Sequence, residues 1–296
     1  MVTFTIAVQI PKDTYGKLAS KWDEIVKKNS FYRSQRETEN EMFSHWILGA
    51  QNEKKALDIG CGTGNHTIML LEKGYDTTAI DVSKEMLEIT KNKIGDYLGK
   101  RVNLLKLKAE NIDSLQTEFQ VIISLGSVVN HFKSWEEFFE KIEKLLKKDG
   151  IFLFSLDNLL GIDSFILTIE QLLSKTEVSA IQEFARSIKC YFKGEYFSEE
   201  WQYQWGNRVL PTKLIYLPPW RVKKMLRQSG IQVLEIRGAN IFSSFLPSIV
   251  RSSWDLDAIL SPRTKRLEHW TSKIDSKVGR ILYFLGAQLV IAGRKA

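Results

Sequence analysis

Residues Lys55–Gly64 read KALDIGCGTG, an apolar strand that runs into three glycines at alternate positions. Glycine reaches backbone angles that other residues avoid, and it lets a ligand lie against the main chain. The stretch therefore predicts a β-strand followed by a turn on which a flat, polar ligand rests. Asp58, near the end of the strand, offers a carboxylate that suits an amino group or a bound water better than a phosphate.

The glycine spacing differs from the dinucleotide fingerprint G-x-G-x-x-G, whose third glycine would fall on Asn65 instead of Gly64. A helix is expected from about Asn65 to Lys73, closed by Gly74, and the next strand, DTTAID, ends in Asp81. An acidic residue at the tip of the second strand can bind both hydroxyl groups of a ribose. The pattern thus indicates a nucleoside ligand.

Further along, strands and helices alternate. We expect a helix capped by Ser83, a strand VNLLKLK ending at Lys108, and a continuous apolar strand FQVIISLG. A capping box at 134–137 begins a helix that Gly150 ends, and the strand IFLFSLD follows. Alternation of this kind predicts a parallel sheet with helices on both faces.

The glycine loop and the acidic end of the second strand together resemble the S-adenosylmethionine site of class I methyltransferases. The resemblance is to the small-molecule branch that includes the ubiquinone and menaquinone methyltransferases, and it covers Lys54 to about Asp157. It implies an α/β, Rossmann-like fold with a seven-stranded, mostly parallel sheet whose last strand is antiparallel and lies beside the fifth. Another nucleotide-binding Rossmann domain is the alternative.

This fold divides the chain as follows. Residues 1–50 are expected to form an N-terminal helical lid of two helices, and the cofactor-binding core comprises 51–158, 218–238 and 279–296. Two insertions, after strand 5 and before the last strand, occupy 159–217 and 239–278 on the substrate side. The last strand is expected within RILYFLGAQLVIAG, residues 280–293.

By the same resemblance the glycine loop lies under the methionine part of the cofactor, and Asp81 holds the ribose. The lid closes on the cofactor with Tyr15, because the run Tyr15–Asp23 is similar to a Y-D-x-x-A-x-x-Y-D pattern of relatives. Arg33, expected in the turn between the two lid helices, meets the methionine carboxylate or is simply an exposed charge. The residues expected to bind cofactor are Tyr15, Arg33, Asp58, Gly60, Cys61, Gly62, Gly64, Asp81, Val82, Met86, Ala109, Glu110 and Leu125.

The adenine contacts depart from the family pattern. Members commonly carry an acidic residue where Lys108 stands, to receive the adenine amino group. Either Glu110 takes that part from two positions on, or the backbone at Ala109 reads the ring alone.

The loop after the fourth strand, Leu125–His131, should face the sulfonium, because ligands bind at the carboxyl ends of parallel strands. His131 in this loop is the candidate catalytic residue, since an imidazole can accept a proton near neutral pH. The alternative is a histidine that caps the following loop or helix.

The first insertion carries Trp201, Tyr203 and Trp205, which alternate with glutamines. On a strand the three rings would share one face, where they could stack a planar substrate or instead form the core of the insertion.

Composition narrows the function classes. The 296 residues are 44% hydrophobic, with a formal net charge of +7, which permits nucleic acid, an anionic membrane surface or an acidic substrate without selecting among them. The two cysteines, Cys61 and Cys190, have no C-x-x-C spacing, so we expect neither a zinc site nor any other metal. We read no signal peptide or membrane span, and expect a cytoplasmic protein in an unknown oligomeric state.

The sequence therefore predicts methyl transfer from S-adenosylmethionine to an oxygen or nitrogen of a small, aromatic or lipophilic acceptor. RNA methylation is supported only by charge, because the place of an N/D-P-P-Y/F motif reads SLGS. A non-catalytic cofactor-binding module that uses its insertions as a partner surface is the other alternative.

Overall fold

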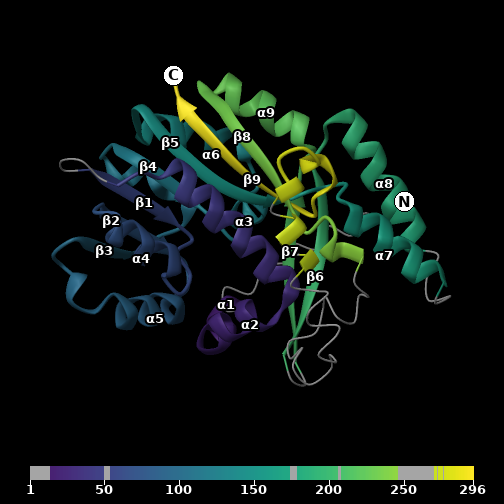
Figure 1. Cartoon of the computed structure of the whole chain (residues 1–296), viewed down its shortest axis with the longest axis horizontal. Coiled ribbons are helices and arrows are strands. Elements are labelled where there is room, and N and C mark those ends of the chain that lie inside the picture. Colours follow the sequence, from purple (N-terminus) through teal and green to yellow (C-terminus); the bar gives the residue numbers. More distant parts are fainter. Residues whose placement is uncertain are drawn as a thin grey trace, which may run out of the picture.

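The computed structural model describes residues 14–49, 54–173, 179–205, 208–245, 270–271, 273–275 and 277–296. Its centre is a seven-stranded sheet in the order β3-β2-β1-β4-β5-β9-β8, seen across the middle of Figure 1. The strands are β1 Lys55–Ile59, β2 Asp76–Asp81, β3 Val102–Lys106, β4 Phe119–Ser124, β5 Leu146–Asp157, β8 Ile231–Ala239 and β9 Gln288–Lys295.

The sheet is parallel except for its last strand in sequence. β1 pairs in parallel with β2 and β4, and β4 pairs in parallel with β5. β9 runs antiparallel between β5 and β8. This order and this antiparallel neighbour confirm the Rossmann-like fold predicted from the sequence, and they bring the carboxyl ends of β1, β2 and β4 to one edge of the sheet.

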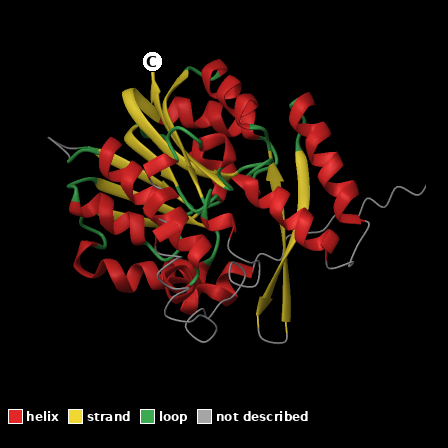
Figure 2. Cartoon of the chain, turned by 45° about the vertical axis from the view of Figure 1, so that its right-hand side comes forward, coloured by secondary structure: helices red, strands yellow, loops and turns green. Residues whose placement is uncertain are grey.

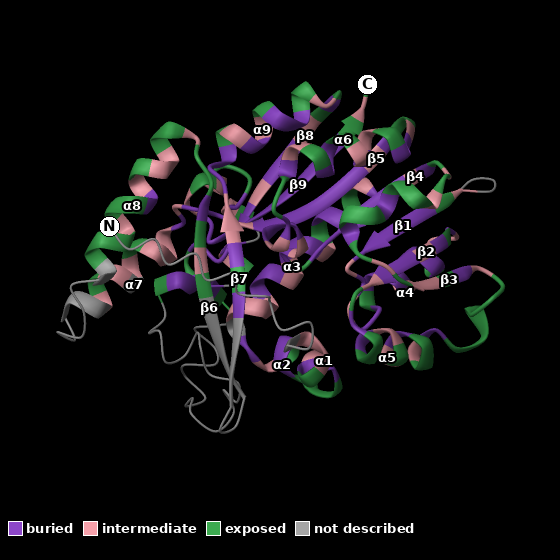
Figure 3. Cartoon of the chain, turned by 180° about the vertical axis from the view of Figure 1, so that it is seen from behind, coloured by how far each residue is buried: buried purple, intermediate pink, exposed green. Residues whose placement is uncertain are grey.

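Two apolar layers sandwich the sheet, and Figure 3 shows the strands as its most buried part. On one face, α6 (Trp135–Leu145) and α9 (Pro219–Gln228) pack against the sheet through side chains that include Phe139, Ile142 and Val222. On the other face, α3 (Ser30–Trp46) and α4 (Asn65–Glu72) cover the sheet, with α3 contributing Met42, Phe43 and its C-cap Ile47. The apolar strands of the sheet are thus covered by helices on both faces.

The N-terminal region differs in detail from the two expected helices. It comprises α1 (Thr14–Leu18), the 3₁₀ turn η1 (Ala19–Lys21), α2 (Trp22–Lys28) and α3. α1 and η1 lie beside α5 (Lys84–Ile94), near the glycine loop (Figure 1). α3 instead forms part of the core, so only the segment before it has the position of a lid.

The first insertion is a helical pair followed by a hairpin. The helices are α7 (Ile162–Leu173) and α8 (Ser179–Lys193), and β6 (Phe197–Trp205) pairs antiparallel with β7 (Arg208–Tyr216). Figure 2 shows this two-stranded ribbon apart from the main sheet. In the second insertion, residues 246–269 lie outside the described part, which begins with the 3₁₀ turn η5 (Ser243–Phe245).

Two predicted helix caps are confirmed, and several predicted ends of helices and strands differ from the structure. Ser83 and Ser134 cap α5 and α6 as predicted, accepting the N–H groups of Met86 and Glu137. Gly150 does not end α6, because the chain turns from helix to strand at Leu146 and Gly150 lies inside β5. The strand expected to end at Lys108 ends at Lys106, and the 3₁₀ turn η3 (Ala109–Leu115) follows it. The last strand, expected within residues 280–293, is preceded by the 3₁₀ turn η7 (Tyr283–Leu285).

Within the described ranges, every helix is too short or too polar to serve as a membrane span.

The packing of α6 against the sheet can be tested by substitution. Phe139 is fully buried in it, whereas Phe192 on α8 is 77% exposed. We expect Phe139→Ala to lower the free energy of unfolding by about 3–5 kcal/mol and Phe192→Ala to change it by less than about 0.5 kcal/mol. Urea denaturation of both variants measures the difference, and equal losses would contradict this placement of α6.

Candidate functional site

The glycine loop between β1 and α4 is left-handed at each of its three glycines. The φ angles are +71° at Gly60, +55° at Gly62 and +83° at Gly64, a region that favours glycine. The N–H groups of Gly60 and Cys61 donate to the carbonyl of Ile80 at the end of β2, at 2.8 and 3.0 Å. The loop is therefore fixed to the neighbouring strand and turns back over the sheet edge.

The surroundings of the three glycines differ. A Cβ at Gly60 would come within 2.6 Å of Val128, and a Cβ at Gly64 within 2.6 Å of Thr90, so these two glycines allow close packing of protein on protein. A Cβ at Gly62 would meet no atom within 4 Å. The main chain at Gly62 thus presents a bare face to open space, as a ligand lying on the loop requires.

Two aspartates flank this bare face. The Asp81 carboxylate accepts the N–H of Gly62 at 2.9 Å and that of Ser83 at 2.8 Å, while Asp58 accepts the hydroxyl of Thr67 at 2.6 Å. Burial raises the pKa of Asp58 to about 7, against the hydrogen bond from Thr67 and with help from the charge of Asp81. Burial also raises the pKa of Asp81, and its backbone hydrogen bonds oppose that shift. The carboxylates of Asp58 and Asp81 thus form an acidic, poorly solvated surface beside Gly62, which suits a cationic or hydroxyl-bearing ligand.

Tyr15 and His131 meet although they are 116 residues apart. Tyr15 on α1 has its hydroxyl 3.0 Å from Nε2 of His131, at the end of the 3₁₀ turn η4 (Val128–His131). The two rings stand edge to face at 5.5 Å between centroids, and Trp22 lies against the other side of Tyr15 at 5.7 Å. The structure therefore joins the expected lid tyrosine and the expected catalytic histidine in one contact.

His131 is neutral at physiological pH in this setting. Burial lowers its pKa to about 4, which outweighs the opposing hydrogen bond to the backbone of Lys213. Nε2 and the Tyr15 hydroxyl share one hydrogen bond, and the tautomer of the imidazole decides which of them donates. The low pKa makes the imidazole a weak base.

The segment before α3 is tied directly to the glycine loop. Oδ1 of Asp23, on α2, accepts hydrogen bonds from the Thr63 hydroxyl at 2.7 Å and from the Asn65 side chain at 3.0 Å. Lys93 on α5 pairs with the other oxygen of Asp23 at 2.5 Å. The chain from α1 to α2 is consequently closed over the loop in this structure.

The side chains that sequence reasoning missed lie on α3. Arg36 donates to Nδ1 of His66, at the start of α4, at 2.9 Å and lies 3.0 Å from the carboxylate of Glu39. Burial and the charge of Arg36 hold the pKa of His66 well below its usual range. A signal was available, because Glu39 falls on the helix face that continues into Met42 and Phe43, where a charge must be paired.

Arg33 was expected in a turn and is not there. It lies in the first turn of α3, and its Nη1 donates to the backbone carbonyl of Lys27 at 3.1 Å. Arg36, one helical turn further on, is the cation whose charge acts on Asp58.

Residues 56–150 match a family model described as "Methyltransferase domain". This segment is therefore a methyltransferase domain, similar to those of S-adenosylmethionine-dependent methyltransferases. The chain is 28% identical over 144 residues to the putative methyltransferase YqeM of Bacillus subtilis, an alignment that covers 47% of this chain and 54% of that protein. The match thus spans about half of that relative's length.

A second relative and a solved structure extend over more of the chain. The uncharacterized protein MJ1252 of Methanocaldococcus jannaschii is 26% identical over 243 residues, with 82% of this chain and 84% of that protein covered. The 1,6-didemethyltoxoflavin-N1-methyltransferase of Burkholderia thailandensis shares the fold with a TM-score of 0.52 at 13% identity, covering 97% of this chain and 88% of that chain.

The remaining predicted cofactor residues lie after β1 to β4: Cys61 is in the glycine loop, Val82 follows β2, Met86 is in the first turn of α5, Ala109 and Glu110 follow β3, and Leu125 follows β4. Val82 is 50% exposed beside the loop, whereas Met86, Leu125 and Cys61 are buried. At the expected adenine position, Ala109 is buried and Glu110 is exposed, with its backbone carbonyl accepting Lys141. Which of the two reads adenine stays a prediction.

The predicted substrate residues Trp201, Tyr203 and Trp205 do occupy alternate positions of a strand, β6. Their side chains lie outside the described part of the chain.

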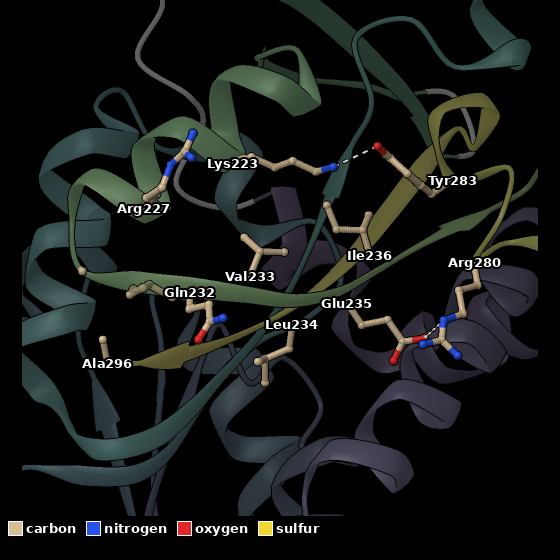
Figure 4. Close-up of a pocket in the computed structure, with 12 residues that line it drawn as sticks. Lys223, Arg227, Gln232, Val233, Leu234, Glu235, Ile236, Arg280, Tyr283 and Ala296 are labelled. Carbon is tan, nitrogen blue, oxygen red and sulfur yellow. Dashed lines mark hydrogen bonds and ion pairs between the residues drawn. The ribbon is translucent and has the colours of Figure 1, made fainter.

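The hollow drawn in Figure 4 is separate from the glycine loop. It has a volume of about 680 Å³ and lies on the edge strand β8, between Lys223 and Tyr283 on one side and Arg280 on the other. β8 is four strands away from β1 in the sheet. This hollow therefore lies at the outer edge of the sheet, away from the glycine loop.

The buried state of His131 predicts a specific pH dependence. Its pKa is about 4 in the folded protein and near 6.5 when unfolded, so the unfolded chain binds the proton first as the pH falls. His131 therefore costs stability between about pH 6.5 and 4. We expect the unfolding free energy of the wild type, relative to His131→Asn, to decrease between pH 7 and pH 5. Parallel pH profiles in urea denaturation would show that His131 is as solvated as in the unfolded chain.

Proposed function

We propose that the protein transfers a methyl group from S-adenosylmethionine to an oxygen or nitrogen of a small, aromatic or lipophilic acceptor. The observation that carries the proposal is the bare main-chain face of Gly62, with open space above it and, beside it, the buried carboxylate of Asp58 and the half-buried carboxylate of Asp81. A nucleoside with a cationic amino-acid tail matches that combination of an open backbone and acidic neighbours.

In this proposal each end of the cofactor has its own partners. Asp81 receives the ribose hydroxyls through the acceptor capacity that its bonds to Gly62 and Ser83 leave on each oxygen. Asp58 faces the methionine ammonium, whose positive charge would lower the raised pKa of this carboxyl. Arg36, rather than Arg33, receives the methionine carboxylate.

The acceptor is expected where the lid meets the loop after β4. Leu125 and the 3₁₀ turn η4 end the central strand, and Tyr15 and His131 close this side of the site. The sulfonium is already activated, so the protein chiefly has to align the nucleophile with the methyl group and exclude water. The Tyr15–His131 pair orients the acceptor and, for an acceptor that must lose a proton, offers Nε2 as its destination.

Two observations support a small acceptor of apolar character. An apolar hollow of about 450 Å³ lies between α7 and α8, lined by Phe165, Phe184 and Phe192, and it begins at Leu160, three residues after the end of β5. The Burkholderia thailandensis relative in fold was solved with bound 1,6-didemethyltoxoflavin and S-adenosylhomocysteine. Both favour a small molecule over RNA, for which the net charge is the available support.

Calorimetry with S-adenosylhomocysteine tests the cofactor step. We expect binding by the wild type and at least about tenfold weaker binding by Asp81→Asn, which keeps one acceptor for Gly62 but loses the charged acceptor for the ribose. Glu85→Gln, an acidic residue of the adjacent helix turn, is the control and should bind normally.

Absence of binding by the wild type would refute the cofactor assignment. To test transfer, a metabolite extract is incubated with methyl-labelled S-adenosylmethionine, and we expect label in a small acceptor. Cofactor binding without any labelled product would instead support a non-catalytic module.

A further inference from the structure

We infer that Glu39 is a positioning residue that aims Arg36 at the amino-acid end of the cofactor. The inference rests on the proposed function and adds to it a residue that contacts no ligand itself. Glu39 lies on α3, is completely buried, and contacts the loop after β4 and strand β5.

One oxygen of Glu39 serves as an anchor. Oε1 accepts the Gly126 N–H at 2.8 Å, the Ser155 hydroxyl at 2.6 Å and the Gln35 amide at 3.1 Å. Three donors from α3, β5 and the loop after β4 fix the plane of the carboxylate. Gln35 also donates to Ser127 at 3.1 Å, so the same helix turn holds two successive residues of that loop.

The other oxygen faces Arg36. Oε2 lies 3.0 Å from Nη1 of Arg36 and has no hydrogen-bond partner among the described residues. Nη1 also reaches His66, which burial keeps neutral, so Glu39 supplies the negative charge on that side of the guanidinium. Arg36 is thereby held from two sides while its side chain remains 22% exposed.

Arg36 still has an unused donor. Its Nε is buried and lacks a hydrogen-bond partner in the described part of the chain. A buried guanidinium N–H without an acceptor is costly, and a carboxylate is the ligand that best fits a guanidinium fork. The methionine carboxylate of the cofactor would meet this need, so the anchored Glu39 prepares Arg36 for that contact before the cofactor arrives.

The isosteric variant Glu39→Gln tests the orientation of Arg36 separately from the packing of the side chain at position 39. Its carbonyl oxygen can keep the three hydrogen bonds to the anchor oxygen, whereas its amide would place a donor against the donor Nη1 of Arg36. Arg36 should then lose its orientation although the fold is kept. Glu41→Gln is the matched control, because Glu41 carries the same charge two residues further on and is exposed.

Two ligands measure the effect of Glu39→Gln on binding of the amino-acid tail. S-adenosylhomocysteine carries the amino-acid tail, and 5′-methylthioadenosine has the same nucleoside without it. In calorimetry we expect Glu39→Gln to weaken S-adenosylhomocysteine about tenfold and 5′-methylthioadenosine less than about twofold, the size of one charge-assisted contact. Arg36→Met should show the same selective loss, and adding Glu39→Gln to it should cause no further loss.

Equal losses of affinity for both ligands would mean that Glu39 only supports the fold. No loss of affinity would mean that Arg36 is oriented without Glu39. Either result overturns the inference and leaves the proposed function standing. Failure of the wild type to bind S-adenosylhomocysteine overturns both. If Glu39→Gln does not fold, Ser155→Ala, which removes one donor from the anchor oxygen, must still show a selective loss of S-adenosylhomocysteine affinity.

Discussion

The hydrogen bond from the Gly62 N–H to Asp81 is the contact on which the site depends. It ties the left-handed glycine turn after β1 to the end of β2, and it leaves the opposite side of Gly62 bare. Gly60 and Gly64 are needed for a different reason, since Val128 and Thr90 occupy the space of their missing side chains. The loop is therefore both tightly packed and open at one place.

Around that place, three parts of the chain that are distant in sequence converge. The segment from α1 to α2 reaches the loop through Asp23, α3 reaches it through Arg36, and η4 brings His131 to Tyr15. These contacts are polar, and burial of the two side chains accounts for the raised pKa of Asp58 and the lowered pKa of His131. Excluding water in this way strengthens the electrostatic contacts on which alignment of a sulfonium depends.

The fold was predictable because its signals are local and repeated. The glycine loop, the acidic end of β2, the capping box of α6 and the alternating strands each indicate their own element, and all agree with one sheet order. One boundary was missed at Gly150, which lies within β5, where the pairing with β4 shifts register, although glycine commonly ends helices.

The polar side of α3 was harder to predict for a physical reason. The place of Glu39 on an apolar helix face indicates that its charge needs a partner but does not identify that partner. The contacts of Glu39 and Arg36 involve Gly126, His66 and Ser155, which lie far away in sequence. Arg33 was expected in a turn between two helices, but α3 has already begun at Ser30.

A crystal structure with S-adenosylhomocysteine tests the central claim most directly, because it shows what occupies the space above Gly62. The account predicts the ribose on Asp81, the amino-acid carboxylate on Arg36 and the sulfur facing the Tyr15–His131 pair. Ligand bound elsewhere, or a nucleoside turned so that its sulfur points away from that pair, would contradict it.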